Sequence, residues 1–457
     1  MAYMNRAPLP LNNRISLHGV PVMYIIYILF ILISPFAGVT LLFLISVLLF
    51  LGTRFSENYV SHSRDVISLY FSLSLMLLFS IVMGGSAYSY PFYIALAAFA
   101  IAIVGNHNSF FSETSQLSDF ESRRSRLKKK SFSIMWGSVF LGIRIAAAFI
   151  AAGWVVFWQN LSISYNLVFF IAVIGAVTGS LFESIPSKID KNISVPLGAG
   201  MAMWIFEEFR YFVPAENTFI ALVFSFILGV LAHRAKIADV SALLSAALLG
   251  VLIIVFSGLP WFLLLLTFFI LGGGFTRYKY KYKKSIGIAQ SKEGIRSYEN
   301  VFSNSTAALV LAVAYGVFSE HSLPIIYAYL GTVATATGDT LASEIGTTAK
   351  ERPRMITTLK FAKPGEDGAV SLLGEFASIL GSAIIGLLAY FLGISDNLLL
   401  SVVIATAGGF FGTNMDSLLG ATLQKNGLLS NSGVNFLATF AGAGFSLLMY
   451  ILIAAIF

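Results

Sequence analysis

Long apolar runs recur along the whole chain and constrain its fold more than any other feature. Two of them are VPVMYIIYILFILIS, which begins at Val20, and AAFIAAGWVVFW, which contains Trp154. A helix of about 20 apolar residues crosses the hydrocarbon core of a bilayer. Of the 457 residues, 57% are hydrophobic and 11% are charged, whereas roughly a quarter of the residues in a soluble domain are charged. The sequence therefore predicts an all-α, polytopic integral membrane protein.

Glycine, proline and charged residues interrupt the apolar sequence and divide it into fifteen predicted transmembrane helices. The predicted helices cover residues 20–35, 36–51, 66–83, 90–105, 134–158, 166–186, 194–212, 218–232, 240–256, 259–273, 300–318, 323–337, 369–393, 397–413 and 432–456.

The lysine and arginine residues gather on one side of this predicted topology. If every helix crosses the bilayer once, the N-terminal tail and the loops after even-numbered helices hold 27 of the 29 Lys and Arg residues. Only Arg144 and Arg210 lie elsewhere. Cytoplasmic loops carry the excess of basic residues in membrane proteins. We therefore expect a protein of the cytoplasmic membrane, with the N-terminus and the long basic loops inside and the C-terminus outside.

Two pairs of short motifs indicate an internal duplication. TGSLFES aligns with FGTNMDS at an offset of 233 residues, which pairs Glu183 with Asp416. The same offset pairs the VGN that contains Gly105 with the TGD that contains Gly338. It spans eight predicted helices, an even number, so the two copies would have the same orientation in the membrane. Chance similarity between glycine-rich helix ends is the alternative.

The composition excludes several kinds of site. The chain has no cysteine, which removes disulfides, thiolate metal sites and cysteine nucleophiles. Its five histidines are scattered without ligand spacing, so a zinc site is not expected. Three basic loops stand out, ESRRSRLKKK, TRYKYKYKK and KERPRMITTLKFAKPG. Topology and attraction to anionic headgroups account for such loops, so we expect membrane lipids and no nucleic acid as partners.

Carboxylates near predicted helix ends are the best functional signal, because charge close to the hydrocarbon core is costly. The densest cluster is TATGDTLASEIGT, where Gly338 allows a close backbone approach to a ligand and Asp339 and Ser343 share a helix face. Glu344 follows in the same cluster, and Asp416 lies at the corresponding end of a later helix. Carboxylates and hydroxyls beside basic residues suit Mg²⁺ that carries phosphates.

A purely structural role for these carboxylates is the alternative. Asp339 and Asp416 would then cap helices or pair with Lys360 or Lys363. The chain contains no GxxxxGK[ST] sequence, so the sequence does not predict a P-loop.

The second half carries an ordered series of motifs that resembles a known family. From about residue 218 onward the chain reads TRYKYKYKKSIGIA, GIRSYENVFSN, GDTLASEIG, RPRMITTLK, DGAVSLLGEFAS, GTNMDSLLGATLQ and NSGVNFLAT. This series is similar to the membrane family labelled domain of unknown function 92, which includes a plant phytyl-phosphate kinase and an animal transmembrane protein. The resemblance implies transfer of a phosphoryl group from CTP to a prenyl monophosphate. The positions that match the family motifs are Lys279, Lys283, Arg296, Asn304, Asp339, Ser343, Glu344, Asp416, Ser417 and Gln424.

The first half is more weakly similar to phytol and dolichol kinases, through SLFESIPSKIDKNISVPL and KKKSFSIMWGS. Those kinases have a Gly-Asp pair where this chain has Gly105 and Asn106, so a metal-binding carboxylate is lost. We therefore expect residues 1–212 to be a degenerate kinase-like domain and residues 218–457 to be the functional one. In the alternative, the first half phosphorylates the alcohol and the second half its monophosphate.

The hypothesis for the site has Mg²⁺ held by Asp339, Glu344 and Asp416, which act as the catalytic carboxylates. Arg296, Arg354, Lys283 and Lys360 would bind the phosphates of CTP and of the prenyl substrate, whose tail would lie between helices. Two rival functions stay open at this point. One is a transporter or flippase for prenyl-phosphate lipids, which would need polar groups near the bilayer midplane. The other is a cytidylyltransferase that forms a CDP-lipid.

Overall fold

The structure is a computed structural model that describes residues 19–55, 63–85, 89–114, 123–185, 188–208, 213–288, 295–318, 320 and 322–456. Arg210, one of the two basic residues that fall outside the predicted cytoplasmic segments, lies outside these described residues.

The described residues form sixteen α-helices, a short π-helix and one two-stranded sheet. The helices of the first half are α1 (Gly19–Ile33), α2 (Val39–Phe55), α3 (Ser63–Val82), α4 (Phe92–Thr114), α5 (Arg123–Trp158), α6 (Tyr165–Ser184) and α7 (Lys191–Glu208). Those of the second half are α8 (Ala215–Arg234), α9 (Val240–Ser257), α10 (Leu259–Arg277), α11 (Tyr280–Ser285), α12 (Tyr298–Val317), α13 (Ser322–Gly346), α14 (Leu372–Phe391), α15 (Leu398–Leu419) and α16 (Asn431–Ile456). The π-helix η4 (Gly420–Gln424) continues α15, and β1 (Arg354–Met355) pairs antiparallel with β2 (Ala369–Val370).

The predicted helix ranges agree well with these elements. Each of the fifteen ranges overlaps one helix, and the additional helix, α11, lies in the basic loop after α10. Within the described residues, nine helices are long and apolar enough to cross a membrane, and three shorter apolar segments lie in α2, α3 and α4. The all-α polytopic class is therefore confirmed, whereas the full number of crossings stays a prediction.

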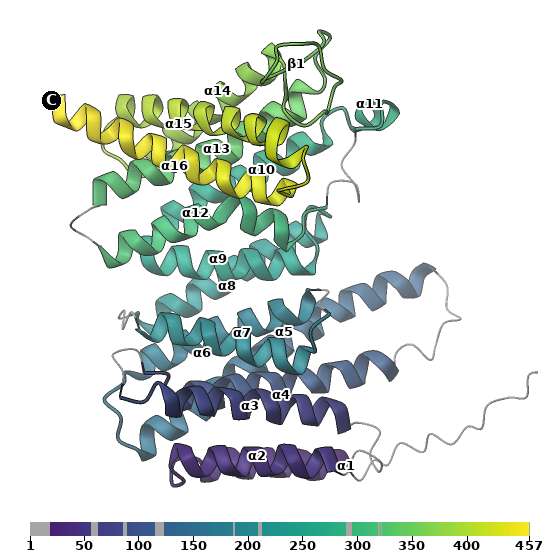
Figure 1. Ribbon diagram of the computed structural model, residues 1–457, viewed down its shortest axis with the longest axis vertical. Coiled ribbons are helices and arrows are strands. Elements are labelled where there is room, and N and C mark those ends of the chain that lie inside the picture. The colour runs from purple at the N-terminus through teal and green to yellow at the C-terminus, as the bar shows by residue number, and fades with distance from the viewer. Residues whose placement is uncertain are drawn as a thin grey trace, which may run out of the picture.

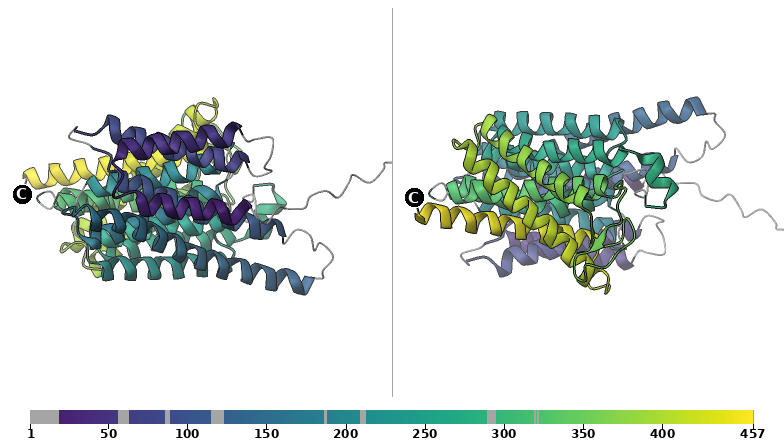
Figure 2. Two further views of the ribbon diagram at one scale, coloured as in Figure 1. Left: turned by 90° about the horizontal axis from the view of Figure 1, so that it is seen from below. Right: turned by 90° about the horizontal axis from the view of Figure 1, so that it is seen from above.

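The helices run side by side along one common direction (Figures 1 and 2). Helices α1 to α7 lie together in the lower part of Figure 1 and α8 to α16 in the upper part, and α6 joins the two parts by packing against α8 and α9. The C-terminal end of α16 lies at one end of the bundle. Helix α11 and the β1–β2 sheet lie at the opposite end, where α5 also extends beyond its neighbours.

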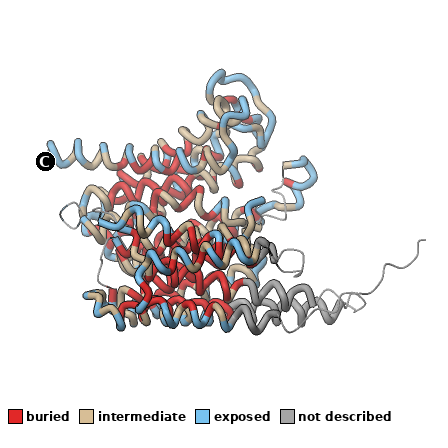
Figure 3. The backbone as a smooth tube through the Cα atoms, turned by 60° about the horizontal axis from the view of Figure 1, so that its bottom comes forward, coloured by how far each residue is buried: buried red, intermediate tan, exposed pale blue. Residues whose placement is uncertain are grey.

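Apolar side chains fill the interior and also cover much of the outer surface. The buried residues form a continuous layer through the middle of the bundle (Figure 3), in a core that spans α1 to α9 and a second one that spans α9 to α16. Large apolar side chains nevertheless stay exposed on the outer helices, among them Phe219, Ile220 and Ile227 of α8. An outer surface of this kind is compatible with lipid and not with water.

Helix α13 is the centre of the second half, since it packs against α10, α12, α14, α15 and α16. It packs tightly against α14 and α15 at Gly338, where an added Cβ atom would lie 2.8 Å from Ser378 Oγ and Ser382 Oγ and 3.1 Å from Thr413 Oγ1. Small residues allow membrane helices to pack this closely. Gly338 thus faces neighbouring helices, whereas the sequence predicted a role beside a ligand.

Candidate functional site

A polar cavity of about 270 Å³ lies at the end of the bundle that carries α11 and the sheet. Its walls come from α12, α13, the segment 347–371, α14, α15 and the start of α16. Asp339 lies seven residues before the end of α13, which is about 10 Å at 1.5 Å per residue. The cavity therefore lies near one end of the helices and not at their midpoint.

The charge of this cavity is strongly acidic. Its lining contains six carboxylates and, among the described residues, one basic side chain, Arg296. The six acidic residues are Asp339, Glu351, Glu366, Asp367, Glu375 and Asp416. The sequence predicted several basic side chains around the ligand, so the acidic character of the lining is a correction to that expectation.

Asp416 is bound by one side-chain amide, which a second amide holds in turn. With the Asn435 amide nitrogen oriented toward α15, Asn435 donates to Asp416 Oδ2 at 3.1 Å. The Asn435 carbonyl oxygen then accepts from Asn304 Nδ2 at 3.3 Å. These contacts join α15, α16 and α12 and hold the Asp416 side chain in a fixed orientation, as a binding site requires.

Arg296 precedes α12 and is held by its backbone. Its N–H donates to the carbonyl of Ile237 at 2.8 Å, and its own carbonyl accepts from the N–H of Asp239 at 3.0 Å. The guanidinium lies 4.9 Å from the ring centroid of Phe268 and 5.6 Å from that of Phe269. Burial lowers the pKa of Arg296 to about 10, an effect that Glu344 partly opposes, so the side chain stays cationic at neutral pH.

One nitrogen of this guanidinium is unsatisfied. Arg296 Nη1 is buried and has no hydrogen-bond partner among the residues that the structure describes. A buried donor without a partner costs about 1–3 kcal/mol. A guanidinium presents its donors in a planar fork that matches phosphate, so Arg296 is well suited to bind an anionic ligand in the cavity.

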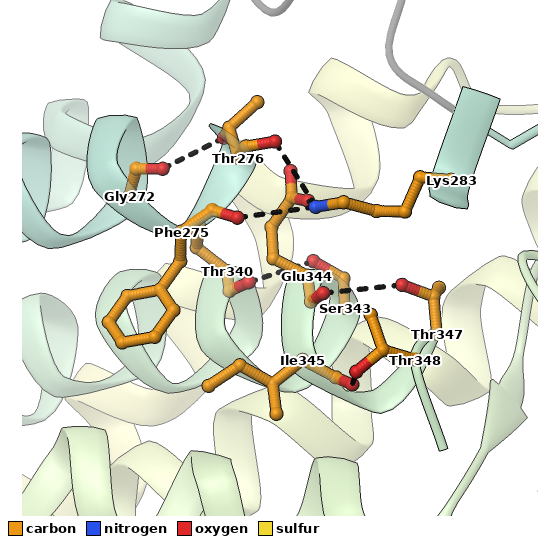
Figure 4. A network of polar contacts seen from close by, with 10 residues as sticks. All are labelled: Gly272, Phe275, Thr276, Lys283, Thr340, Ser343, Glu344, Ile345, Thr347 and Thr348. Atoms are coloured by element: carbon orange, nitrogen blue, oxygen red, sulfur yellow. Dashed lines mark hydrogen bonds and ion pairs between the residues drawn. The ribbon is translucent and has the colours of Figure 1, made fainter. Parts of the chain in front are cut away.

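Lys283 and Glu344 form an ion pair (Figure 4). Neither residue lines the cavity, although Ser343 beside Glu344 does. The side chains of Lys283 and Glu344 are 4% and 6% exposed. The Lys283 ammonium also donates to the carbonyls of Phe275 at 3.2 Å and Thr276 at 3.1 Å, in the last turn of α10. Lys283 therefore fastens α11 to the end of α10 and to α13.

The segment between α13 and α14 folds over the cavity as a loop with a small sheet. Arg354 of β1 donates to the carbonyl of Leu359 at 3.0 Å, and its guanidinium lies 4.5 Å from the ring centroid of Phe361. Lys360 is exposed on this loop. Neither Arg354 nor Lys360 lines the cavity, so the loop covers the site without directing these two cations into it.

Glu366 anchors the same loop to Lys425, the residue that follows η4. It accepts from the backbone N–H of Lys363 at 3.2 Å and forms an ion pair with Lys425 at 3.3 Å. The Lys363 N–H and then the Lys425 ammonium hold the pKa of the Glu366 carboxyl below its usual range.

The structure brings together six of the predicted site residues and separates the others from the cavity. The lining includes Arg296, Asn304, Asp339, Ser343, Asp416 and Ser417. The predicted residues outside it are Lys279, Lys283, Gly338, Glu344, Arg354, Lys360 and Gln424. In the described part of the chain, no group of three or more His, Cys, Asp or Glu side chains is arranged to hold a metal ion. The predicted set of Asp339, Glu344 and Asp416 is therefore not assembled, because Glu344 is paired with Lys283.

Several lining residues were not predicted as site residues. Asn300, Asp367, Glu375 and Asn435 belong to this group. All four lie within the motifs GIRSYENVFSN, DGAVSLLGEFAS and NSGVNFLAT, so the signal was present in the sequence. It was missed because the assignment favoured basic residues and the densest acidic cluster.

The first half contains a buried charged network of a different kind. Arg144 of α5, which the positive-inside pattern left as an exception, is 2% exposed. It donates to Ser180 Oγ at 2.6 Å and forms an ion pair with Glu183 of α6. An added Cβ atom at Gly105 of α4 would collide with the Arg144 guanidinium. The side chain of Asn106 lies outside the described residues.

These features define a class: a polytopic helical membrane protein with an acidic cavity at one end of its second half. The integral membrane protein family DUF92 matches residues 223–443, which contain every described lining residue of the cavity. The chain belongs to this family, and the resemblance inferred from the motifs is thus confirmed.

Three relatives illustrate the match. An uncharacterised membrane protein of Methanocaldococcus jannaschii is 33% identical over 51% of this chain and 94% of its own length. An uncharacterised membrane protein of Synechocystis is 35% identical over 43% of this chain and 76% of its own. The chloroplastic protein VTE6 of Arabidopsis thaliana is 30% identical over 46% of this chain and 64% of its own. No solved structure matches the chain.

Proposed function

We propose that the second half of the chain is a CTP-dependent kinase that phosphorylates a prenyl monophosphate, such as phytyl or geranylgeranyl phosphate, to the diphosphate. The observation that carries this proposal is the acidic cavity at one end of the membrane helices, in which Arg296 is the one basic side chain among the described residues. The carboxylates of such a cavity can bind the metal cation that accompanies a nucleotide. The cavity also lies where a membrane-embedded lipid can present its phosphate. The family resemblance supplies the reaction type, and the match to VTE6 supports it.

Mg²⁺ fits the donor set of this cavity. Asp339 and Asp416 lie close enough for their charges to interact, and both supply the hard oxygen atoms that Mg²⁺ prefers. Mg²⁺ usually takes one or two carboxylates and completes its octahedral shell with water and phosphate oxygens, so Glu344 is not needed. The ion would neutralise charge on the nucleotide phosphates.

The residues of the chain then act mainly by positioning and charge. Asp416 is oriented by Asn435, and Arg296 donates to a phosphate through Nη1. An oxygen of the prenyl monophosphate attacks the γ-phosphorus of CTP, the bond from that phosphorus to the β–γ bridging oxygen breaks, and CDP leaves. Because the acceptor oxygen is already anionic, no strong general base is required.

The placement of the cavity favours a kinase over a carrier. The cavity lies near one end of the helices, whereas a carrier for prenyl phosphates needs polar groups at the midplane. The lysine-rich helix α11 lies at the same end, which by the positive-inside rule would be the cytoplasmic side. We propose this orientation in the cytoplasmic membrane because it gives the site access to CTP.

We further propose that the first half, residues 1–212, is a degenerate copy of the second, residues 218–457. The contacts among α4, α5, α6 and α7 correspond to those among α13, α14, α15 and α16, since five of the six pairs pack together in each group. The pair that packs little or not at all is also the corresponding one, α5 with α7 and α14 with α16. At the offset of 233, Ser180 corresponds to Thr413 and Glu183 to Asp416.

The buried network of the first half explains why this copy would be inactive. Arg144 would stand where the second half has Ala377, and its guanidinium pairs with Glu183. An internal cation would therefore fill the site that the second half keeps open for a ligand.

The decisive experiment incubates the purified protein with geranylgeranyl phosphate, CTP and Mg²⁺ and detects the products by mass spectrometry. We expect geranylgeranyl diphosphate and CDP, and at least a 100-fold loss of rate in Asp339→Asn and Asp416→Asn, because mutation of a group that stabilises the transition state costs about 10²–10³ in rate. Asp396→Asn is the matched control, since Asp396 is exposed between α14 and α15 at the far end.

Other products would reassign the function. CDP-lipid and pyrophosphate would indicate cytidylyl transfer. Transport of prenyl phosphate across vesicles without any new product would indicate a carrier. Diphosphate formed from the free alcohol would mean that both halves are active.

A further inference from the structure

An apolar groove shares Arg296 with the acidic cavity. It lies on α9 between α8 and α10, has a volume of about 70 Å³, and is lined by apolar side chains apart from Ser225 and Arg296. Small residues form much of its floor, among them Gly229 of α8 and Ala246 of α9. The acidic cavity and the groove thus meet at a single guanidinium.

The groove has a limited length along α9. Its lining on α9 runs from Ala242 to Leu249, which is about 10 Å along the helix axis. At the end far from Arg296, Phe224 of α8 approaches Phe262 of α10 with ring centroids 6.2 Å apart. The groove therefore offers a path of about 10 Å along α9 before these rings limit it.

The groove also has access to the bilayer. Helix α9 packs against both α8 and α10, whereas α8 and α10 have few contacts with each other. Helix α8 exposes large apolar side chains, including Ile227 at 52% and Leu231 at 54%. A lipid chain could thus enter between α8 and α10 without crossing a polar surface, and the remainder of a longer chain would stay in the bilayer.

We propose that this groove binds the first part of the hydrocarbon chain of the prenyl monophosphate, with the phosphate held at Arg296. This inference rests on the proposed function, since it assigns a subsite to the same substrate. Arg296, whose Nη1 has no hydrogen-bond partner among the described residues, lines both the acidic cavity and the groove. A guanidinium at such a junction matches the boundary between an anionic headgroup and its single chain.

A substitution that fills part of the groove tests this assignment through the kinetics of the reaction. Ala246 is half-buried and lines the groove, so Ala246→Leu inserts extra carbon atoms where the chain would lie. We expect kcat/KM for geranylgeranyl phosphate, relative to dimethylallyl phosphate, to fall at least about tenfold, because each lost methylene contact in an apolar pocket changes specificity about 10-fold or more. Ala314→Leu on α12 is the control, since Ala314 is also half-buried and lies outside the groove. An unchanged ratio in Ala246→Leu would overturn the assignment.

Photolabelling provides a second measurement that needs no turnover. A geranylgeranyl phosphate analogue with a diazirine near its phosphate should label peptides of α8, α9 and α10, and unlabelled geranylgeranyl phosphate should compete. Labelling confined to α14, α15 or α16 would contradict the proposal. So would equal labelling by a diazirine phosphatidylcholine that geranylgeranyl phosphate does not displace, because the groove would then hold a bilayer acyl chain. If the wild-type protein forms no diphosphate, the proposed function fails, and this measurement still decides whether the groove binds a prenyl chain.

Discussion

Replacing Lys283 by Met tests whether the buried ion pair with Glu344 maintains the architecture beside the cavity. Both side chains are at least 94% buried, and removing one partner of such a pair costs about 3–5 kcal/mol because the other charge stays in a medium of low dielectric. Lys283→Met also removes donors from the carbonyls of Phe275 and Thr276. The loss of unfolding free energy should therefore lie near the upper end of this range.

Glu344→Gln should be milder, because Lys283 keeps its two carbonyl acceptors and gains a neutral oxygen in place of the carboxylate. We expect a loss of about 1–3 kcal/mol. The double variant Lys283→Met/Glu344→Gln should be more stable than the sum of the single losses predicts, by about 1–3 kcal/mol, since neither charge is then left alone.

The measurement is reversible unfolding by SDS in mixed micelles, followed by the fluorescence of the five tryptophans. Lys425→Met is the control, because the Lys425–Glu366 pair is exposed and should contribute little. A loss below about 1 kcal/mol for Lys283→Met would refute the reasoning from burial. A stable double variant also separates folding from chemistry: if it keeps full activity, neither side chain binds phosphate or metal.

Three further perturbations follow from single contacts. Gly338→Ala places a Cβ atom 2.8 Å from Ser378 Oγ and should lower unfolding stability by about 1–3 kcal/mol through overpacking; a neutral result would show that the helices can move apart. The lowered pKa of Glu366 means that its contribution to loop stability is complete above the ordinary value of 4.5 and is lost as the pH falls through the lower folded value. Amide hydrogen exchange of the segment 351–368 should therefore accelerate below pH 4.5, and Glu366→Gln should remove this dependence. Arg144→Leu should cost about 3–5 kcal/mol by leaving Glu183 without its guanidinium, and Arg144→Leu/Glu183→Leu should recover most of that loss; SDS unfolding would show no recovery if the pair were not coupled.

The apolar pattern was sufficient to predict most helices because each one needs about 20 apolar residues to cross the bilayer. It failed at the end of α13, which continues nine residues beyond the predicted end at 337 and stops at Gly346. The polar residues of GDTLASEIG are typical of a helix end in an isolated sequence. In the folded chain, neighbouring helices surround this turn, so Gly338 and Glu344 are buried within the helix.

The sequence predicted the positions of the acidic side chains of the site better than those of the basic ones. Asp339 and Asp416 have short side chains on helices, so the position of the backbone largely determines where their carboxylates lie. Lysine and arginine side chains are long, and tertiary contacts decide their direction. Lys283 therefore reaches Glu344, and Arg354 covers Phe361, where the sequence had predicted phosphate contacts.

The resulting separation of charge determines what can bind. Basic side chains of α11 and of the loop before Gly365 lie outside the cavity, and Gly365 itself contacts Ile288 just after α11. This outer layer attracts anions and the anionic surface of the membrane. The cavity beneath it is acidic except for Arg296, so it repels a free phosphate chain and favours one whose charge a divalent cation already neutralises. For the proposed phosphoryl transfer to a prenyl monophosphate, we therefore expect the nucleotide to enter as its magnesium complex, which satisfies both layers.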